Sequence, residues 1–533
     1  MKHSSQTKII LFLCNWGAHA AYQTLQDELR AIPDQVHMIR IPCTGRIDRA
    51  LLLKAFAMGA DGVALVGCDP GTCRYGAGTT AAQRNTTDTG KILELLGLGK
   101  ERVRFATVLP EESEQLLAFL HSFLDDLVRL GPSTIQQQPA VAELELAVDS
   151  DQRLQQIIAA HDIHACQDCG KCSSACPLAL IGKPFSARGI ATAVINGELH
   201  QESVRENVWS CLTCGLCYER CPSAVNFPAF IQELRHLYRQ KQSQGDESHG
   251  GFLHSLMRSM ASAELKPKRW QNLPEKLRID QESTTLFYGG CAPYYDIFFG
   301  KHLDVQTEKI LFDAIGLLNF FDVFPRLLDD ERCCGHDLLC AGDKDHFQKI
   351  AALNGERLNN LGITTMITSC PECYQTFKST YPAQGIELNF EVVHLYDFLE
   401  QEIDRSAVRF TPLDRRLTFQ DSCRLARLEN RAELPRQLLN RLQPASYEEM
   451  QDSGRAAICC GNSGWIGCDT YSKAMQVKRL EQVRATKADL LITACPKCQI
   501  HLKCAMEDPF RLDTPSVEML DLTSVIAQTI SWK

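Results

Sequence analysis

The chain has 533 residues, of which 44% are hydrophobic and 23% charged, and this indicates a soluble globular protein of about three or four domains. Its net charge of −9, without a basic run, argues against a nucleic-acid-binding surface. The 25 cysteines do not indicate a small disulfide-stabilised domain, because a chain of this length can bury a core; their Cys-x2-Cys spacings indicate reduced thiolates that hold metal.

The start of the chain does not have the pattern of a secretory signal. The apolar run Ile9–Cys14 is only six residues long and ends at Asn15, which is shorter than the usual hydrophobic region. No stretch of about eighteen apolar residues occurs in the chain, so a membrane span is not expected. We therefore expect a cytoplasmic protein.

Residues up to about 130 alternate short apolar runs with longer amphipathic ones. This pattern predicts a βα repeat, and hence a largely parallel sheet with helices on its faces. The expected helices include Asp48–Met58 and Glu111–Leu130, and the expected strands are Lys8–Cys14, Val36–Pro42, Gly62–Cys68 and Val103–Leu109.

Four cysteines accompany these strands. Cys14, Cys43 and Cys68 fall at or just beyond strand ends, and Cys73 follows Cys68 by five residues. Because ligands of open parallel sheets bind outside the carboxyl ends of the strands, we expect the four thiols to converge. They are candidate ligands of one 2Fe-2S cluster or of zinc, with buried structural cysteines as the alternative. The nearby segment "YGAGTTA" imitates a phosphate-binding loop but does not directly follow a strand, and we interpret it as a turn.

The region 151–240 is expected to be helical around two dense cysteine motifs. The run Cys-x2-Cys-x2-Cys-x3-Cys-Pro occurs twice, which is typical of bacterial two-cluster ferredoxins. In that pattern the fourth cysteine of each run binds the other cluster. We therefore assign one cubane 4Fe-4S cluster to Cys166, Cys169, Cys172 and Cys221, and the other to Cys211, Cys214, Cys217 and Cys176. A pair of zinc sites is the alternative, which two complete runs argue against.

From about residue 283 the chain repeats itself. Each half has a single cysteine, then Cys-Cys-Gly, then Cys-Pro-x-Cys at the start of a helical pattern, whose free N–H groups favour an anionic cluster. The side chains of two adjacent cysteines diverge, so they suit different irons of a spread-out cluster. A vicinal disulfide or a zinc site is the alternative, but neither explains five cysteines placed alike in both halves. The candidate ligands are Cys291, Cys333, Cys334, Cys370 and Cys373 in the first half, and Cys423, Cys459, Cys460, Cys495 and Cys498 in the second.

Three cysteines remain outside these groups. We expect Cys340, Cys468 and Cys504 to be small core residues rather than ligands. Cys334-x-His336 imitates half of a Rieske site, but no second Cys-x2-His partner exists. We therefore expect His336 at most to contact the cluster ligands, without binding iron itself.

Two polar stretches, 133–150 and 241–282, are expected to be linkers. The expected domains are residues 1–132, 151–240, 283–410 and 411–533. The predicted fold class is therefore multidomain α/β: an N-terminal parallel-sheet α/β domain, a helical two-cluster ferredoxin domain, and two tandem α/β domains that each contain one Cys-Cys-Gly.

Several segments resemble known families. "FLCNWGAHAAY", "IRIPCTGRID" and "AFAMGADGVALVGCDPGTCRY" resemble the delta subunit of methyl-viologen-reducing hydrogenase, a 2Fe-2S electron connector, although Gly17 stands where that family commonly has another cysteine. "WSCLTCGLCYERCPSAV" resembles the C component of heterodisulfide reductase, and the Cys-Cys-Gly halves resemble its B component. In the B component each five-cysteine set holds a non-cubane 4Fe-4S cluster, and a disulfide is cleaved between the two. The 41 residues between Cys291 and Cys333 are slightly more than that family usually has.

These resemblances imply an iron–sulfur component of a heterodisulfide reductase-like oxidoreductase of anaerobic metabolism. Electrons would arrive from a flavoprotein similar to the A component of heterodisulfide reductase, or from a hydrogenase or dehydrogenase partner, and would reduce a disulfide substrate. The implied cofactors are one 2Fe-2S cluster, two cubane 4Fe-4S clusters and two non-cubane 4Fe-4S clusters, with no flavin on this chain.

Two alternatives stay open. One is an electron relay to a membrane quinone module, with peripheral contact to a membrane protein, or within a 2-hydroxy-acid dehydrogenase complex. The other is a non-enzymatic assembly protein with zinc sites, which metal analysis separates from an iron–sulfur protein.

Overall fold

The computed structural model describes residues 7–135, 150–241, 243, 245–406, 408–461, 463–511 and 513–531. Most of the predicted linker 133–150 lies outside these residues. Within them, no helix has the length and apolar character that crossing a membrane requires. The chain divides into two compact units, one made of Met1–Glu143 and His249–Arg269, the other of Leu144–Ser248 and Trp270–Lys533.

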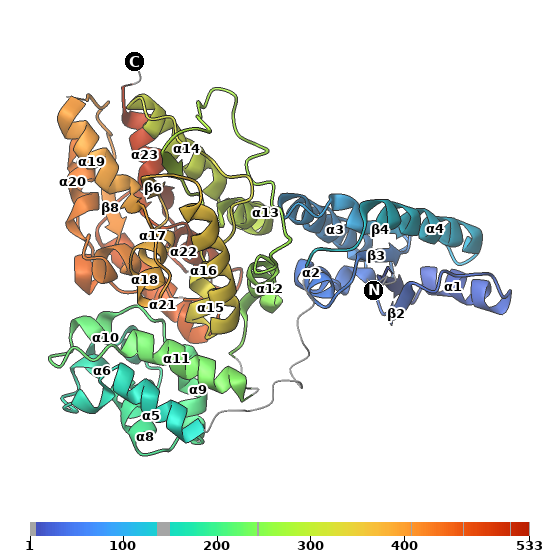
Figure 1. Cartoon of the computed structure of the whole chain (residues 1–533), viewed down its shortest axis with the longest axis horizontal. Helices are drawn as coiled ribbons and strands as arrows, with labels where there is room; N and C mark the ends of the chain where they lie inside the picture. Colours follow the sequence, from blue (N-terminus) through green and yellow to red (C-terminus); the bar gives the residue numbers. More distant parts are fainter. Residues whose placement is uncertain are drawn as a thin grey trace. The chain divides into compact units, whose positions relative to one another are not determined.

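The first unit is built on a four-stranded parallel sheet in the order β2-β1-β3-β4. Figure 1 draws the strands of this sheet in blue. The strands are β1 (Ile9–Cys14), β2 (Val36–Ile41), β3 (Gly62–Gly67) and β4 (Val103–Thr107). The central strands β1 and β3 are apolar and almost fully buried, as strands covered on both faces must be. The predicted parallel sheet is confirmed, and each strand begins and ends within two residues of its expected bounds.

The helices of the first unit pack in two groups. α1 packs against α4, and α2 packs against α3 and α12. α12 lies within the predicted linker 241–282, so that stretch contains ordered structure belonging to the first unit. The bounds are α1 (Ala18–Asp27), α2 (Arg49–Ala57), α3 (Gly78–Leu95), α4 (Ser113–Leu130) and α12 (Phe252–Ser259).

The segment "YGAGTTA" is a turn only in its first part. Tyr75–Ala77 forms turns and bends, whereas the residues from Gly78 onward already belong to α3. The prediction of a turn is therefore correct for the first three residues and wrong for the rest, because the helix begins inside the segment.

The ferredoxin-like part of the second unit is helical, and the residues described between 150 and 241 contain no strand. Two short helices, α6 and α10, each follow one of the cysteine loops and pack against each other. The bounds are α5 (Ser150–Ala160), α6 (Lys171–Ala175), α7 (Pro177–Leu180), α8 (Ala187–Ile195), α9 (Glu202–Ser210), α10 (Leu216–Glu219) and α11 (Phe227–Gln240).

The C-terminal duplication forms two parallel sheets, in the orders β5-β6-β7 and β11-β10-β8-β9. In each repeat one strand leads into the Cys-Pro-x-Cys motif: β6 in the first repeat and β10 in the second. β6 lies between β5 and β7, and β10 lies between β11 and β8. The strands are β5 (Thr285–Phe287), β6 (Thr365–Thr368), β7 (Glu391–His394), β8 (Arg416–Gln420), β9 (Ser446–Tyr447), β10 (Leu490–Thr493) and β11 (Glu518–Asp521).

The two repeats pack on each other through helices. α14 of the first repeat contacts α23 of the second, and α13 contacts α22. The helices of the first repeat are α13 (Ala292–Leu303), α14 (Thr307–Phe320), α15 (His336–Cys340), α16 (Lys344–Asn359), α17 (Pro371–Gln375), α18 (Tyr381–Ala383) and α19 (Leu395–Ser406). Those of the second are α20 (Glu433–Arg441), α21 (Thr470–Ala485), α22 (Pro496–Met506) and α23 (Leu522–Thr529). The predicted multidomain α/β fold class is confirmed.

Candidate metal centres

The four N-terminal cysteines meet at the carboxyl edge of the first sheet. The Sγ atoms of Cys14 and Cys68 lie 3.5 Å apart, and those of Cys43 and Cys73 are within hydrogen-bonding contact. Cys14 ends β1, and Cys68 directly follows β3, its neighbour in the sheet. Adjacent parallel strands bring their ends together, and this explains why residues far apart in sequence form one group.

These thiols differ in their electrostatic surroundings. Burial, followed by contact with Cys14, raises the pKa of Cys68 to about 12. Burial alone would raise the pKa of Cys73 too, but backbone N–H groups of Tyr75, Thr79 and Gly78 donate to its sulfur and lower that pKa overall. The start of α3 therefore provides N–H donors for a negatively charged sulfur.

Two glycines border this group. A Cβ at Gly78 would come within 2.3 Å of the Cys43 Sγ and 2.9 Å of the Cys73 Sγ, so only glycine fits there. Gly17 also lies beside the group, since a Cβ at this position would be 3.6 Å from the Cys68 Cβ. The position at which the related family commonly has a cysteine is thus next to the four thiols.

The two ferredoxin-like loops have the same backbone path. In each, the residue before the second cysteine and the glycine after it have positive φ: Asp168 and Gly170 in one loop, Thr213 and Gly215 in the other. In the second loop the Thr213 N–H donates to the Cys211 Sγ at 3.4 Å, a contact that suits a thiolate ligand of an anionic cluster. Two loops of one design agree with the two-cluster pattern of the sequence.

One predicted set of cubane ligands lines a single small cavity. Its wall contains Cys176, Cys211, Cys214 and Cys217, together with apolar side chains such as Phe185 and Phe227. The fourth cysteine of the first run therefore lies beside the first three cysteines of the second run, as the ferredoxin pattern requires. The other set comprises Cys166, Cys172 and Cys221, which are half-buried, and Cys169, which is exposed.

The five cysteines of each C-terminal repeat form a chain of thiol contacts in the same order. In the first repeat Cys333 contacts Cys291 and Cys334, and Cys373 contacts Cys334 and Cys370. In the second repeat the corresponding contacts join Cys423, Cys459, Cys460, Cys498 and Cys495 in that order. The duplication of the sequence is thus also a duplication of the site.

In each repeat the second member of the Cys-Cys pair is the preferred thiolate. Hydrogen bonds from Cys333 and Cys373 lower the pKa of Cys334 well below its usual value. Those from Cys459 and Cys498 lower the pKa of Cys460 to about 6. The following glycines, Gly335 and Gly461, have φ of +85° and +100°, which explains why glycine follows the cysteine pair in both repeats.

The first repeat's cysteines line a cavity that the second repeat helps to close. All five predicted ligands of the first set contribute to its wall, and so do Cys495 and Lys497 of the second repeat. Cys495 is a predicted ligand of the second set. The two five-cysteine sets therefore approach each other at this cavity.

A buried group of charged residues, not foreseen from sequence, lies at the same cavity. Lys497 forms ion pairs with Asp337 and, at 2.7 Å, with Glu372. His336, expected to lie behind the ligands, lines the cavity, and its Nε2 lies 3.6 Å from Glu372. Each of these residues is within three positions of a cysteine motif, and this was the only available sequence signal.

The ferredoxin-like region docks on the second repeat through buried arginines. Arg427 Nη1 donates to the Cys214 carbonyl at 2.6 Å, and Arg424 Nη1 donates to the Thr213 carbonyl at 2.7 Å. The thiol of Cys459 lies close enough to Cys214 for that neighbour to influence its ionisation. The predicted cubane set with Cys214 is therefore adjacent to the second five-cysteine set.

The three remaining cysteines differ from one another. Cys340 is fully buried, as expected for a core residue. Cys468 is exposed, so its prediction as a core residue is wrong, and Cys504 is half-buried, with its Sγ 3.0 Å from Lys473 Nζ. Cysteine is usually buried, but the start of α21 near Cys468 faces solvent.

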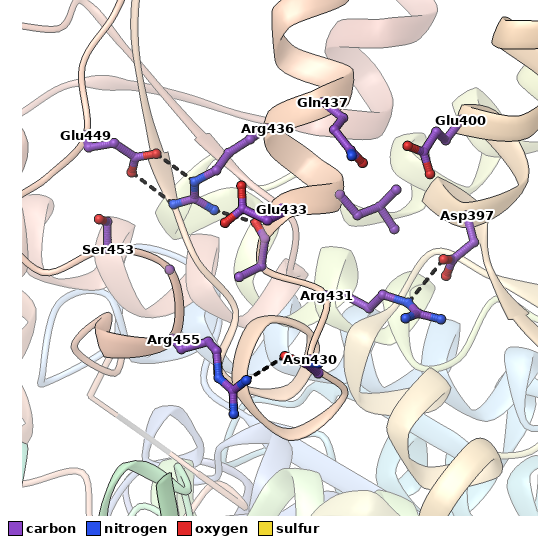
Figure 2. Close-up of a pocket in the computed structure, with 13 residues that line it drawn as sticks. Asp397, Glu400, Asn430, Arg431, Glu433, Arg436, Gln437, Glu449, Ser453 and Arg455 are labelled. Atoms are coloured by element: carbon purple, nitrogen blue, oxygen red, sulfur yellow. Dashed lines mark hydrogen bonds and ion pairs between the residues drawn. The ribbon is translucent and has the colours of Figure 1, made fainter. Parts of the chain in front are cut away.

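A further hollow, shown in Figure 2, is open and strongly polar. Its arginines are already paired: Arg431 with Asp397, Arg436 with Glu449, and Arg455 with Asn430 (Figure 2). No predicted cysteine ligand lines it. We therefore do not assign the redox chemistry to this hollow.

The donor sets suit iron–sulfur clusters. Each consists of thiols alone, which are the protein ligands of iron–sulfur clusters, and zinc shares this preference. The thiols of the C-terminal sets are closely surrounded: a Cβ at Gly290, for example, would lie 2.8 Å from the Cys373 Sγ.

Comparison with known families agrees with this arrangement. Residues 9–131 match the family of the methyl-viologen-reducing hydrogenase delta subunit, and residues 145–225 match the 4Fe-4S dicluster domain. The cysteine-rich domain matches twice, over residues 299–378 and 417–503.

Known relatives each match part of the chain. The B component of fumarate reductase (CoM/CoB) from Methanothermobacter marburgensis is 29% identical over 227 residues, which are 42% of this chain and 45% of that protein. The D component of dihydromethanophenazine:CoB–CoM heterodisulfide reductase from Methanosarcina acetivorans is 28% identical over 265 residues, or 48% of this chain and 62% of that protein. The iron–sulfur D component of the F420-non-reducing hydrogenase vhc from Methanococcus voltae is 34% identical over 137 residues, 26% of this chain and 95% of that protein. The chain thus spans only about half of the first of these relatives.

The fold and the cysteine groups define an iron–sulfur electron-transfer protein. Through its N-terminal sheet domain, the chain belongs to the family of the methyl-viologen-reducing hydrogenase delta subunit. Over 48% of its length the chain is also similar to a component of heterodisulfide reductase, which is an oxidoreductase complex.

Proposed function

We propose that this chain is the disulfide-reducing iron–sulfur component of a heterodisulfide reductase-like complex. The observation that carries the proposal is the cavity lined by all five cysteines of the first set and by Cys495 of the second. A cluster held by the first set would occupy this cavity beside Cys495, so a disulfide bound between the two C-terminal clusters would contact both. The two relatives whose names include CoM and CoB support a disulfide or dithiol as the substrate class.

The ligand assignment proposed is the one that the sequence predicts. Cys14, Cys43, Cys68 and Cys73 would hold a 2Fe-2S cluster, and the ferredoxin-like cysteines would hold two cubane 4Fe-4S clusters. Each C-terminal set would hold a non-cubane 4Fe-4S cluster. When bound, the C-terminal clusters would supply electrons and open iron positions for sulfur.

The chain's own residues would direct the electrons and enclose the substrate. The contacts of Arg424 and Arg427 with the loop around Thr213 and Cys214 keep one cubane set beside the second five-cysteine set. Electrons would therefore enter the C-terminal pair through the second repeat. Two electrons and two protons convert one disulfide into two thiols, the electrons coming from a reduced flavoprotein or a hydrogenase-type partner.

Around the cavity, Lys497 forms ion pairs with both Asp337 and Glu372. This pairing keeps buried carboxylates close to the cysteines without leaving them unpaired, which would be costly. Tyr295 and Leu311 supply an apolar part of the wall, which would limit access of water.

The first test is chemical analysis of the anaerobically isolated chain. We expect about eighteen irons per chain, with matching acid-labile sulfide and little zinc. Zinc in place of iron would overturn the proposal.

The second test is reactivity. The chain is reduced with reduced methyl viologen and is then offered the CoB–CoM heterodisulfide, cystine or, in a separate arm, a water-soluble quinone. We expect reoxidation by a disulfide, and we expect it to be lost in Cys495→Ser but kept in the exposed control Cys468→Ser. Reoxidation by the quinone alone would favour the relay function instead.

A further inference from the structure

One buried thiol outside the predicted ligand sets lies where three parts of the second unit meet. Cys340 ends α15, six residues after Cys334, and its side chain is fully buried. It is not part of either five-cysteine pattern. Its surroundings are unusually polar for a cysteine in a core.

Four polar side chains surround the Cys340 sulfur. The nitrogen neighbours are Gln232 Nε2 at 3.4 Å, His336 Nε2 at 3.5 Å and Arg424 Nη2 at 3.6 Å, and the Thr213 hydroxyl donates at 3.7 Å. Gln232 and Thr213 belong to the ferredoxin-like region, His336 to the first repeat and Arg424 to the second. One sulfur atom therefore contacts all three parts.

Arg424 strengthens the same junction. Its guanidinium donates to the Thr213 carbonyl at 2.7 Å, to the Thr213 hydroxyl at 2.8 Å and to the Ser463 hydroxyl at 3.1 Å. It is buried, and a buried cation is stable only where acceptors surround it. The Cys340 sulfur is one of these acceptors.

The packing leaves no room for a larger side chain. A Cβ at Gly464 would come within 2.9 Å of the Cys340 Cβ, so the loop that follows Cys460 lies directly against α15. In addition, Arg235 of α11 donates to the Cys340 carbonyl at 2.5 Å. Both the side chain and the backbone of Cys340 thus join the elements.

Three of the polar neighbours are adjacent to predicted cluster ligands. Thr213 lies between Cys211 and Cys214, Arg424 directly follows Cys423, and His336 is two residues after Cys334. A displacement of Cys340 would therefore also move residues beside the ligands of one cubane loop and of both Cys-Cys-Gly repeats. Hydrogen bonds that surrounding residues make to metal ligands tune the reduction potential of the metal site.

We propose that Cys340 is a positioning residue for electron transfer. Its thiol keeps the loop Cys211–Cys217 in a fixed arrangement with the loops of Cys423 and Cys334, and so sets the reduction potential and the rate at which electrons pass into the C-terminal pair. This role rests on the proposed function, but it does not depend on the identity of the disulfide.

The test compares Cys340→Ala with Cys340→Ser in the full-length chain isolated with its clusters. Alanine removes the acceptor, whereas the serine hydroxyl can still accept from Arg424. The exposed Cys468→Ala is the control. Three quantities are measured: the iron content, the potential of each cluster from an EPR-monitored titration, and the rate of cluster reoxidation after mixing with an oxidant.

We expect all variants to keep their iron. In Cys340→Ala the potential of one 4Fe-4S signal should shift and electron transfer should slow by about tenfold. Cys340→Ser should recover most of the wild-type behaviour, and Cys468→Ala should match the wild type. Because potentials are measured without a disulfide, this result is independent of whether any disulfide is reduced.

Two outcomes would overturn the proposal. Loss of about four irons in both Cys340 variants would make Cys340 a cluster ligand instead of a positioning residue. Unchanged potentials and unchanged transfer rates in Cys340→Ala would show that Cys340 is an ordinary buried side chain without a positioning role.

Discussion

The Lys497 ammonium lies 2.7 Å from the Glu372 carboxylate, and the two residues hold the same position in the two repeats. Each is the variable residue of a Cys-Pro-x-Cys motif, one at the start of α22 and the other at the start of α17. The contact therefore brings the two motifs face to face. Opposite charges at equivalent positions favour pairing of one repeat with the other.

Replacement of Lys497 tests how strongly this contact holds the repeats together. Lys497→Met would leave Asp337 and Glu372 buried without a cation, so we expect the free energy of unfolding to fall by about 3–5 kcal/mol. Anaerobic chemical denaturation measures it. Lys349→Met, an exposed lysine of α16, is the control and should change little. Equal stability of the two variants would contradict the importance of the pair.

A single methyl group at Gly78 should disrupt the N-terminal centre alone. Because its Cβ would overlap the sulfurs of Cys43 and Cys73, Gly78→Ala is expected to lose the 2Fe-2S EPR signal while the 4Fe-4S signals remain. Gly90→Ala is a matched control in the same helix, where the nearest atoms are 3.5 Å away. A 2Fe-2S signal of full intensity in Gly78→Ala would show that these cysteines do not hold the cluster.

The stability of the chain should depend on pH through Asp521. Burial raises the pKa of this carboxyl to about 7, against the lowering effect of hydrogen bonds from Thr523 and Tyr396; Asp313 adds a repulsive charge. The folded state therefore holds a proton that the unfolded state releases near its ordinary pKa of about 4. Stability should be fully present below that value and should decrease as pH rises towards 7.

Asp521→Asn should remove this dependence. The amide stays neutral and can still accept from the Thr523 N–H at the start of α23. Between pH 5 and 7 the wild type should lose up to about 1.4 kcal/mol per pH unit more than the variant. Parallel denaturation series at several pH values measure the difference, and identical slopes would rule out Asp521 as the titrating group.

The docking of the ferredoxin-like region should depend on the shape of Arg427, not only on its charge. The guanidinium donates to the carbonyls of Cys214, Arg455 and Ala457. A lysine cannot reach three carbonyls, so Arg427→Lys should leave buried acceptors unpaired and cost about 2–4 kcal/mol. Hydrogen exchange of residues 211–217 should become faster, whereas Arg441→Lys, on the exposed face of α20, should leave it unchanged. Unaltered exchange in Arg427→Lys would argue against this docking role.

Local patterns in the sequence were sufficient to predict the strands of the first unit and the helix starts at Pro371 and Pro496. They were sufficient because these features depend on residues close together in the chain: apolar runs form buried strands, and proline suits the first turn of a helix. The spacing of Cys-Cys-Gly likewise predicted two equivalent sets of cysteines, and the structure shows the same order of thiol contacts in both.

What the tertiary structure alone decided is which separate segments meet. The pairing of Lys497 with Glu372, the approach of Cys495 to the first set, and the junction at Cys340 each join residues more than 80 positions apart. Such contacts arise where the two repeats pack on each other and where the ferredoxin-like region packs on both repeats. No periodicity or spacing within a single segment encodes them, because the energy of a buried contact depends on partners that only folding brings together.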